Sequence, residues 1–170
     1  MKRWIKIIAW VIGSVVVVFF LFALWYRQTY SMNVAAAFEV NNPSHPQHIL
    51  IATQGSDFKD SVVHELIREF KSKQMYIKVI DITDLPSINE DTWTALIIIH
   101  TWEYSKPPRE VKSFVDRTKD KKKLIVLTTS GDGNYKIEGI DAITSASKLS
   151  DVSINSAEII NRVNNLLSTQ

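Results

Sequence analysis

The stretch that decides the fold is residues 95–99, which read Ala-Leu-Ile-Ile-Ile. Five consecutive apolar residues without polar alternation are typical of a central parallel strand that is covered on both faces. A Pro-Pro step at residues 107–108 then opens a segment with helical spacing, where proline is favourable in the first turn. A buried strand followed by a helix predicts one unit of a parallel α/β sheet.

Similar units occur on both sides of this stretch. Apolar runs alternate with segments whose apolar residues recur at steps of three and four. The expected strands lie at residues 49–52, 76–81, 95–99, 124–127 and 141–145. The expected helices lie at residues 60–73, 107–117 and 156–167. Asp60 or Ser61 is a suitable N-cap for the first of these helices.

Together these elements predict an α/β domain with a doubly wound, five-stranded parallel sheet. Right-handed crossovers leave few topologies, and this spacing suits the strand order 2-1-3-4-5. Ligands of such sheets bind beyond the carboxyl ends of the strands, where the order reverses between the first and third strands. The loops that reach this place are residues 53–60, 100–107 and 128–135. Any chemistry is therefore expected at these three loops.

Ahead of the domain, residues 7–26 form a run of 20 residues without a charge. At about 1.5 Å per residue this run makes about 30 Å of helix, the thickness of a bilayer's hydrocarbon core. Trp4 before the run and Trp25 and Tyr26 at its end suit the two membrane interfaces. The sequence therefore predicts a single-pass membrane protein whose anchor contacts the lipid bilayer.

The expected organisation has three parts. Residues 1–30 are the N-terminal membrane anchor, with a helix at about residues 5–27. Residues 31–47 are expected to be a linker, because Pro43 and Pro46 block regular structure there. Residues 48–170 are expected to form the α/β domain.

A cleaved signal peptide is the alternative reading of the N-terminus. Its apolar region usually has roughly 7–15 residues, which this run exceeds, and the small residues 35–37 lie well beyond the end of the run. The flanking charges predict the orientation of an uncleaved helix. Lys2, Arg3 and Lys6 precede it and only Arg27 follows it closely, so the positive-inside rule places the N-terminus in the cytoplasm and the domain outside.

Charge and composition exclude several classes of function. The first 30 residues carry +4 and the whole chain carries +2, so the rest carries −2 and no nucleic-acid partner is expected. The absence of cysteine excludes disulfides, thiolate metal sites and a cysteine nucleophile. The four histidines have no metal-ligand spacing, and no hydrolase, nucleotide-binding or zinc-protease motif occurs. A phosphorylated receiver is also excluded, because the third strand ends in His100 and offers no acceptor aspartate.

Three stretches resemble one known family. Residues 49–56 read Ile-Leu-Ile-Ala-Thr-Gln-Gly-Ser, residues 95–102 read Ala-Leu-Ile-Ile-Ile-His-Thr-Trp, and residues 128–133 read Thr-Thr-Ser-Gly-Asp-Gly. They are similar to the first strand with its phosphate loop, the third strand with the first flavin-flanking loop, and the second flavin loop of flavodoxins. The chain thus resembles the flavodoxin-like family over residues 48–168, as a membrane-anchored member. Because the segment between the fourth and fifth strands, residues 128–140, is short, we expect the family's fourth helix to be missing or reduced.

The resemblance implies FMN as the cofactor. Hydroxyls and backbone amides at a helix N-terminus would bind its phosphate. Aromatic side chains would flank its ring, and the candidates are Trp102 and Tyr104 in the second loop and Tyr135 in the third. The residues implied to bind the cofactor are Thr53, Gln54, Gly55, Ser56, Ser61, Thr101, Trp102, Tyr104, Thr129, Ser130, Gly131 and Asp132.

The first loop departs from the family pattern, and two functions stay open. Asp57 and Asp60 bring negative charge to the place of a phosphate, and Lys59 can offset one of them. The first hypothesis is a membrane-tethered protein that uses FMN to transfer electrons to a redox partner protein or to reduce a small acceptor. The second is a non-catalytic, membrane-anchored domain that keeps the fold and has lost the flavin.

Overall fold

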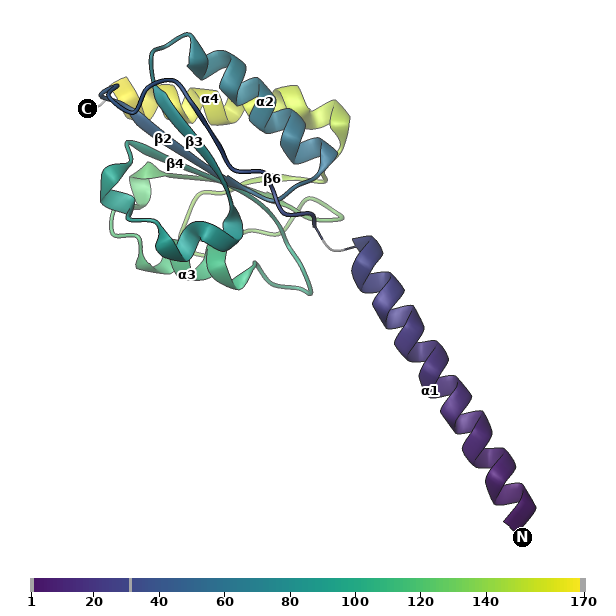
Figure 1. The fold of residues 1–170 in the computed structure, drawn as a ribbon. Helices are drawn as coiled ribbons and strands as arrows, with labels where there is room; N and C mark the ends of the chain where they lie inside the picture. The colour runs from purple at the N-terminus through teal and green to yellow at the C-terminus, as the bar shows by residue number, and fades with distance from the viewer. Residues whose placement is uncertain (1, 31, 169–170) are drawn as a thin grey trace. The chain divides into compact units, whose positions relative to one another are not determined.

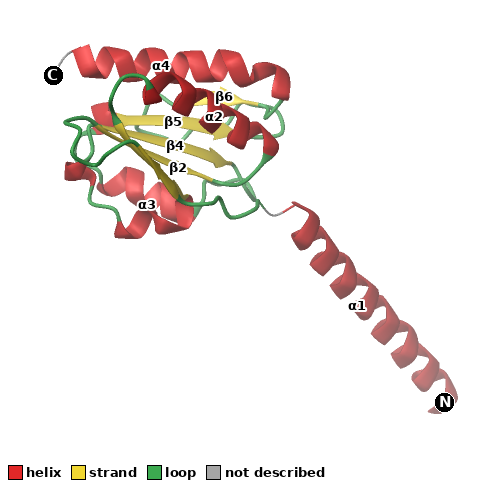
Figure 2. Ribbon diagram, turned by 45° about the horizontal axis from the view of Figure 1, so that its top comes forward, coloured by secondary structure: helices red, strands yellow, loops and turns green. Residues whose placement is uncertain are grey.

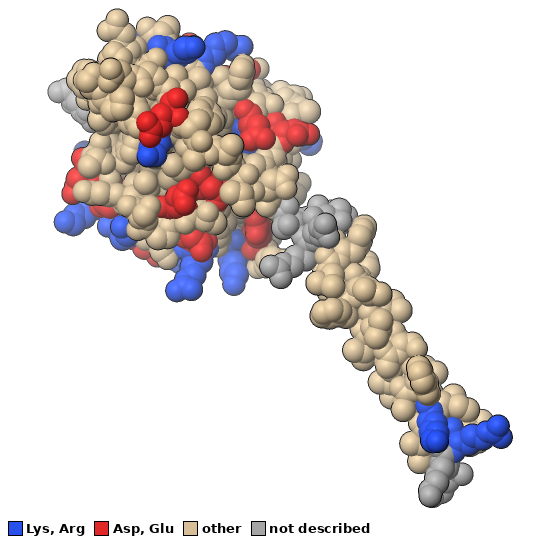
Figure 3. Space-filling view, viewed as in Figure 1, with Lys and Arg blue, Asp and Glu red and all other residues tan. Residues whose placement is uncertain are grey.

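The computed structural model describes residues 2–30 and 32–168. The chain divides into two units, Met1–Met32 and Asn33–Gln170, and each is described by itself. The first unit is helix α1 (Lys2–Tyr30), which extends a few residues beyond the predicted helix at both ends. Its segment Arg3–Tyr26 is exposed throughout and is long and apolar enough to cross a membrane. Among the side chains described in this helix, Figure 3 shows Lys and Arg only near its start.

The second unit is built on a six-stranded sheet in the order β1-β3-β2-β4-β5-β6. Five of these strands are parallel and follow the predicted order, because β2 lies between β3 and β4. The strands are β1 (Phe38–Val40), β2 (His48–Thr53), β3 (Tyr76–Asp81), β4 (Ala95–Thr101), β5 (Leu124–Thr129) and β6 (Ile143–Ser145). The predicted α/β class and parallel sheet are confirmed, and one edge strand was missed.

The missed strand, β1, lies in the segment that was predicted to be a linker. It pairs antiparallel with β3, with Phe38 opposite Val79 and Val40 opposite Ile77. The expectation of an irregular linker over residues 31–47 is wrong for this part, because both prolines lie after β1 and leave its amides free to pair. An ion pair between Glu39 and Lys78 (3.1 Å) joins the same two strands.

Helices cover both faces of the sheet (Figures 1 and 2). Helices α2 (Asp57–Lys71) and α4 (Val152–Ser168) pack together on one face. Helix α3 (Arg109–Arg117) and the 3-10 helix η1 (Ile82–Ser87) cover the other. Between β5 and β6 the described chain contains no helix, so the prediction of a missing fourth helix is confirmed.

Helix α2 begins earlier than predicted. Its N-cap is Ser56, whose hydroxyl accepts the amide of Lys59, and not Asp60 or Ser61. Asp57 and Asp60 then lie in the first turn, where negative charge favours the positive end of the helix dipole. Because the helix begins at Asp57, Lys59 lies within its first turn and on its buried face.

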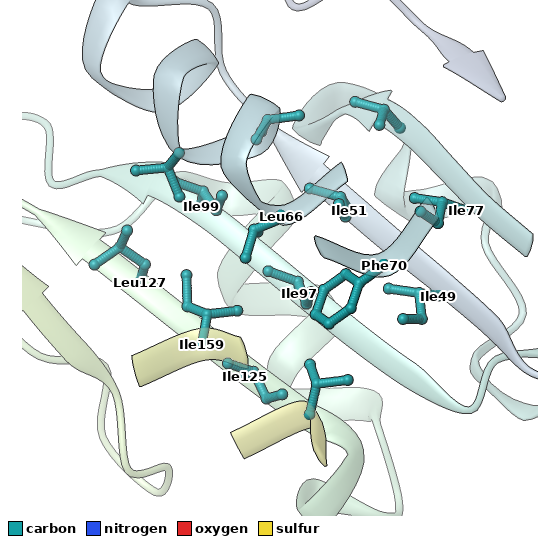
Figure 4. Packing of buried hydrophobic residues seen from close by; sticks show 14 of the residues in the cluster. Ile49, Ile51, Leu66, Phe70, Ile77, Ile97, Ile99, Ile125, Leu127 and Ile159 are labelled. Atoms are coloured by element: carbon teal, nitrogen blue, oxygen red, sulfur yellow. The ribbon is translucent and has the colours of Figure 1, made fainter. Parts of the chain in front are cut away.

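The core consists of two layers, one on each side of the sheet. Figure 4 shows the first layer, in which Leu66, Phe70 and Ile159 from the two helices pack on the isoleucines and leucines of the strands. Successive residues of β2 point to opposite layers, so the strand is apolar on both faces. Each such side chain stabilises the fold by about 1.5–3 kcal/mol through its burial. The sheet is therefore a rigid base for the loops at its carboxyl edge.

Candidate functional site

The candidate site lies at the carboxyl ends of β2, β4 and β5, where sequence analysis placed it. Polar side chains are buried here, although the rest of these strands is apolar. The buried polar residues of these strand ends and the loops after them are Thr53, Gln54, His100, Thr128, Thr129 and Ser130. Buried polar groups cost free energy unless they are hydrogen-bonded, so their partners define what the site can do.

Gly55, in the centre of the first loop, is bonded to the segment that leads into β1. Its amide donates to the carbonyl of Asn33 at 2.7 Å, and the amide of Asn33 donates back to the carbonyl of Gly55 at 3.2 Å. A Cβ atom on Gly55 would lie 3.0 Å from the Cβ of Asn33, so glycine permits this approach. We call residues 33–40 the strap. The strap uses the amide that a phosphate would need.

Asp81 binds the strap at a second point. The amide of Ala35 donates to Oδ2 of Asp81 at 2.7 Å, and Oδ1 of Asp81 accepts from the amide and the hydroxyl of Thr83. A cleft of about 460 Å³ opens between the strap and α2, and Asp57 and Asp60 line it. Two carboxylates beside this space repel a phosphate, as the sequence suggested.

The remaining polar groups of the first loop also bond within the protein. The side-chain carbonyl of Gln54 accepts the amide of Thr101 at 2.8 Å, and its Nε2 donates to Glu103 at 2.9 Å. Thr53 donates its hydroxyl to the carbonyl of Gln54 at 3.2 Å. Ser61 lies one turn into α2 and donates to the carbonyl of Asp57, so it is not part of the loop.

Lys59, which the sequence analysis named only as a charge that offsets a carboxylate, lies inside the candidate site. Its side chain is 1% exposed, and its Nζ donates to the hydroxyl of Thr101 at 2.7 Å and to that of Ser56 at 3.4 Å. Thr101 in turn bonds the hydroxyl of Thr129 at 3.0 Å. Burial lowers the pKa of Lys59 to about 8, although the charge of Glu103 favours the protonated form.

A signal for Lys59 was present in the sequence. Residues 59, 62, 63, 66 and 70 all fall on the buried face of α2, so Lys59 continues an apolar stripe towards the site. Since the predicted helix began at residue 60, Lys59 was not recognised as part of this buried face.

His100 is buried beside this cluster. Its Nε2 lies 3.0 Å from the hydroxyl of Thr128, and its Nδ1 lies 3.2 Å from the carbonyl of Thr101. Since a carbonyl only accepts, Nδ1 carries the proton of a neutral ring. Burial, with a smaller contribution from the charge of Lys59, lowers the pKa of His100 to about 4, although the hydrogen bond to Thr101 acts in the opposite direction. His100 is therefore neutral at pH 7.

The aromatic residues of the second and third loops stack on each other. Trp102 and Tyr135 lie with ring centroids 5.3 Å apart and planes within 12°. The indole Nε1 of Trp102 is buried and has no hydrogen-bond partner. Tyr104 does not join them, because its side chain is 79% exposed.

The third loop is closed by its own hydrogen bonds. The hydroxyl of Ser130 donates to Asp132 at 2.9 Å and accepts the amide of Gly133 at 2.9 Å. The hydroxyl of Ser130 and the amide of Asn134 hold the pKa of Asp132 below its usual range. Gly131 is exposed with open space around it, whereas Gly133 has a φ of +73° that favours glycine.

Arranged in this way, the residues do not fit FMN. The amide of Gly55 and the side chains of Gln54 and Ser56 are bonded within the chain. A flavin ring between two aromatic rings needs about 7 Å, twice the contact distance of about 3.5 Å between carbon atoms. Trp102 and Tyr135 are closer than that.

Comparisons with known proteins gave matches only among solved structures. No family model matches, and no curated protein matches. The flavodiiron core Flv1 from Synechocystis sp. PCC6803 is similar over 75% of this chain, with a TM-score of 0.53 and 9% sequence identity. The fold is flavodoxin-like. This chain covers 38% of that flavodiiron structure, so the likeness concerns one part of it.

Two smaller proteins were also matched. Oxidised flavodoxin 2 from Bacillus cereus has a TM-score of 0.48 and 14% identity, with 69% of this chain and 99% of that chain covered. An oxidoreductase from Corynebacterium diphtheriae has a TM-score of 0.47 and 11% identity, with 75% and 100% covered. At these identities the comparisons concern the fold alone.

Proposed function

We propose that this protein is a membrane-anchored flavodoxin-fold domain that works without FMN and is not catalytic. One observation carries the proposal: Gly55 and Asn33 exchange two backbone hydrogen bonds where a flavodoxin-like loop would bind phosphate. The stack of Trp102 on Tyr135 supports it from another side of the site. The domain then serves as a rigid module presented at a membrane.

Helix α1 supplies the anchor in this proposal. An exposed apolar helix of this length is stable in a bilayer, where its backbone is fully bonded internally. Within the apolar run, the hydroxyl of Ser14 donates to the carbonyl of Trp10 and so is not left unsatisfied. By the positive-inside rule, the flanking charges favour an N-terminus in the cytoplasm, and this orientation is part of the proposal.

The rival function is FMN-dependent electron transfer to a redox partner protein or a small acceptor. One observation favours it: Trp102 and Tyr135 come from the two loops that would flank a flavin, and the Nε1 donor of Trp102 is unused. In that case the flavin would supply the redox chemistry.

The colour of the purified full-length chain separates the two functions. The proposal predicts a colourless protein in detergent whose melting temperature is unchanged by excess FMN. A yellow protein with flavin absorbance, or a clear rise in melting temperature with FMN, contradicts it. Riboflavin serves as the matched control, because a response to FMN alone would locate the binding energy in the phosphate.

A further inference from the structure

The loops after β4 and β5, at the carboxyl edge of the sheet, carry three aromatic side chains, and two of them are exposed. Tyr104 is 79% exposed and Tyr135 is 46% exposed, while Trp102 lies between Tyr135 and the core. The amide of Trp102 donates to the carbonyl of Thr129 at 2.7 Å, which fixes the two loops side by side. We call Trp102, Tyr104 and Tyr135 the aromatic tip.

A tight turn presents Tyr104 at the end of its loop. Glu103 and Lys106 exchange two backbone hydrogen bonds of 2.9 and 3.0 Å, and the two residues between them have left-handed φ values of 49° for Tyr104 and 60° for Ser105. Such two-residue turns prefer Asn-Gly, so a tyrosine here is held against its backbone preference. The turn keeps a large ring in water that packing would otherwise bury.

Charged side chains of both signs lie close in sequence to the aromatic tip. Lys106 and Lys136 are exposed next to the two tyrosines. The acidic neighbours are engaged, because Glu103 accepts from Gln54 and Asp132 accepts from Ser130. Hydrogen bonds from these neutral donors leave both carboxylates charged, so the two lysines supply exposed ammonium groups beside the rings without an excess of positive charge.

The chain from the helix enters the domain at this same edge. Helix α1 ends at Tyr30, and Asn33 is already bonded to Gly55. The next residue back, Gln54, bonds Glu103, which stands directly before Tyr104. A short path of hydrogen bonds thus joins the entry point of the chain to the aromatic tip.

We infer that the aromatic tip is a lipid-contacting surface, in which Tyr104 and Tyr135 lie at the membrane interface and Lys106 and Lys136 face lipid phosphates. Tyrosine and tryptophan favour the interface because their rings are amphipathic, and lysines are attracted to anionic headgroups. A lipid surface is favoured over a protein partner because the chain that enters this edge comes from a helix able to cross a bilayer. The inference rests on the membrane anchoring proposed above.

Because the chain has no cysteine, single cysteines can test the inference in the full-length protein. Ser105→Cys places a fluorescent label on the tip and keeps both tyrosines. Asp91→Cys is the matched control in an exposed turn directly before the amino end of β4. Val16→Cys reports on the helix itself. Each variant is reconstituted in phosphatidylcholine vesicles containing phosphatidylglycerol, with and without brominated lipid chains as quencher.

The inference predicts quenching and a blue shift at residue 105, none at residue 91, and quenching at residue 16. Adding Tyr104→Asp, or Lys106→Glu with Lys136→Glu, is expected to reduce the quenching at residue 105. Circular dichroism checks that each variant is folded.

Three results would overturn the inference. Quenching at residue 16 without quenching at residue 105 would refute the lipid contact of the aromatic tip. It would remain consistent with the membrane anchor. A label at residue 105 that is shielded only at high protein density in the vesicles shows a contact between copies of the chain instead. Absence of quenching at residue 16 overturns the anchor and the lipid contact together.

Discussion

The two ends of the sheet bury aromatic and polar side chains in opposite ways. At the amino end, Tyr76 stacks on Trp93 with centroids 6.0 Å apart, and His48 packs edge-on against Tyr76 at 5.1 Å. Nε2 of His48 lies 2.8 Å from the carbonyl of His45, and the hydroxyl of Tyr76 bonds Glu39. The aromatic side chains at this end therefore contribute to the packing of the fold.

The carboxyl end instead keeps groups that oppose burial. It encloses the ammonium of Lys59 and the imidazole of His100, and it leaves the indole nitrogen of Trp102 unpaired. Each of these groups costs free energy that an apolar side chain would not. The difference indicates that the residues at the carboxyl end do not serve stability alone. Side chains of the protein itself occupy this end of the sheet.

The largest expected effect is the loss of a tryptophan from the packed end. Trp93→Ala is predicted to lower the free energy of unfolding by about 3–5 kcal/mol, because a buried, stacked ring is removed. Trp102→Ala is predicted to cost only about 1–2 kcal/mol, since Trp102 is partly exposed. Chemical denaturation of the full-length chain in detergent measures both, and equal costs would contradict the contrast.

Acidification is predicted to lower the free energy of unfolding through His100, at the carboxyl end of the sheet. The pKa of His100 is about 4 in the folded protein against an ordinary value of 6.5, so between these values the unfolded chain binds a proton that the folded chain does not. Stability is therefore lost as the pH falls from 6.5 towards 4, by about 2–3 kcal/mol. His100→Gln is expected to remove this pH dependence, whereas His64→Gln, at an exposed position, is expected to keep it.

Alkaline pH is predicted to act on the two ends with opposite sign. Since the pKa of Lys59 is about 8 instead of 10.5, stability rises between these values as the unfolded chain alone holds the proton. The pKa of Tyr76 is raised to about 12, so stability falls again as the pH passes 10. Melting temperature against pH measures both limbs.

The variant Lys59→Met sharpens this prediction. It is expected to stabilise the fold by about 1–3 kcal/mol at pH 7 and to abolish the alkaline rise, because an apolar chain of similar length replaces a buried ammonium. Lys73→Met, in the turn just after the end of α2 and partly exposed, is expected to change stability by less than about 0.5 kcal/mol. A strongly destabilised Lys59→Met would show that the ammonium holds the site together.

The smallest expected effect concerns the strap. Gly55→Ala is predicted to cost about 1 kcal/mol, because the new Cβ meets Asn33 at 3.0 Å and pushes the strap away. Gly131→Ala, with nothing within 4 Å, is expected to leave stability unchanged. Amide exchange of Asn33 is expected to accelerate in the first variant alone, and unchanged exchange in both would refute the close contact.

The sequence predicted the fold better than the site. Apolar runs report directly on buried strands, so the five parallel strands and their order were predictable. β1 was not, because three edge residues without an apolar run leave no periodic signal. The bond between Asn33 and Gly55 joins residues far apart in the chain through backbone atoms alone, which no side-chain pattern records. The inward turn of Lys59 depended on a helix start that was placed too late.

The exchange rate of the Gly55 amide tests the central claim most directly. The structure gives this amide a 2.7 Å bond to Asn33, so it is predicted to exchange slowly in the full-length chain and at the same rate when FMN is added. An amide that exchanges freely alone and becomes protected only with FMN would show a working phosphate loop, and would contradict the account.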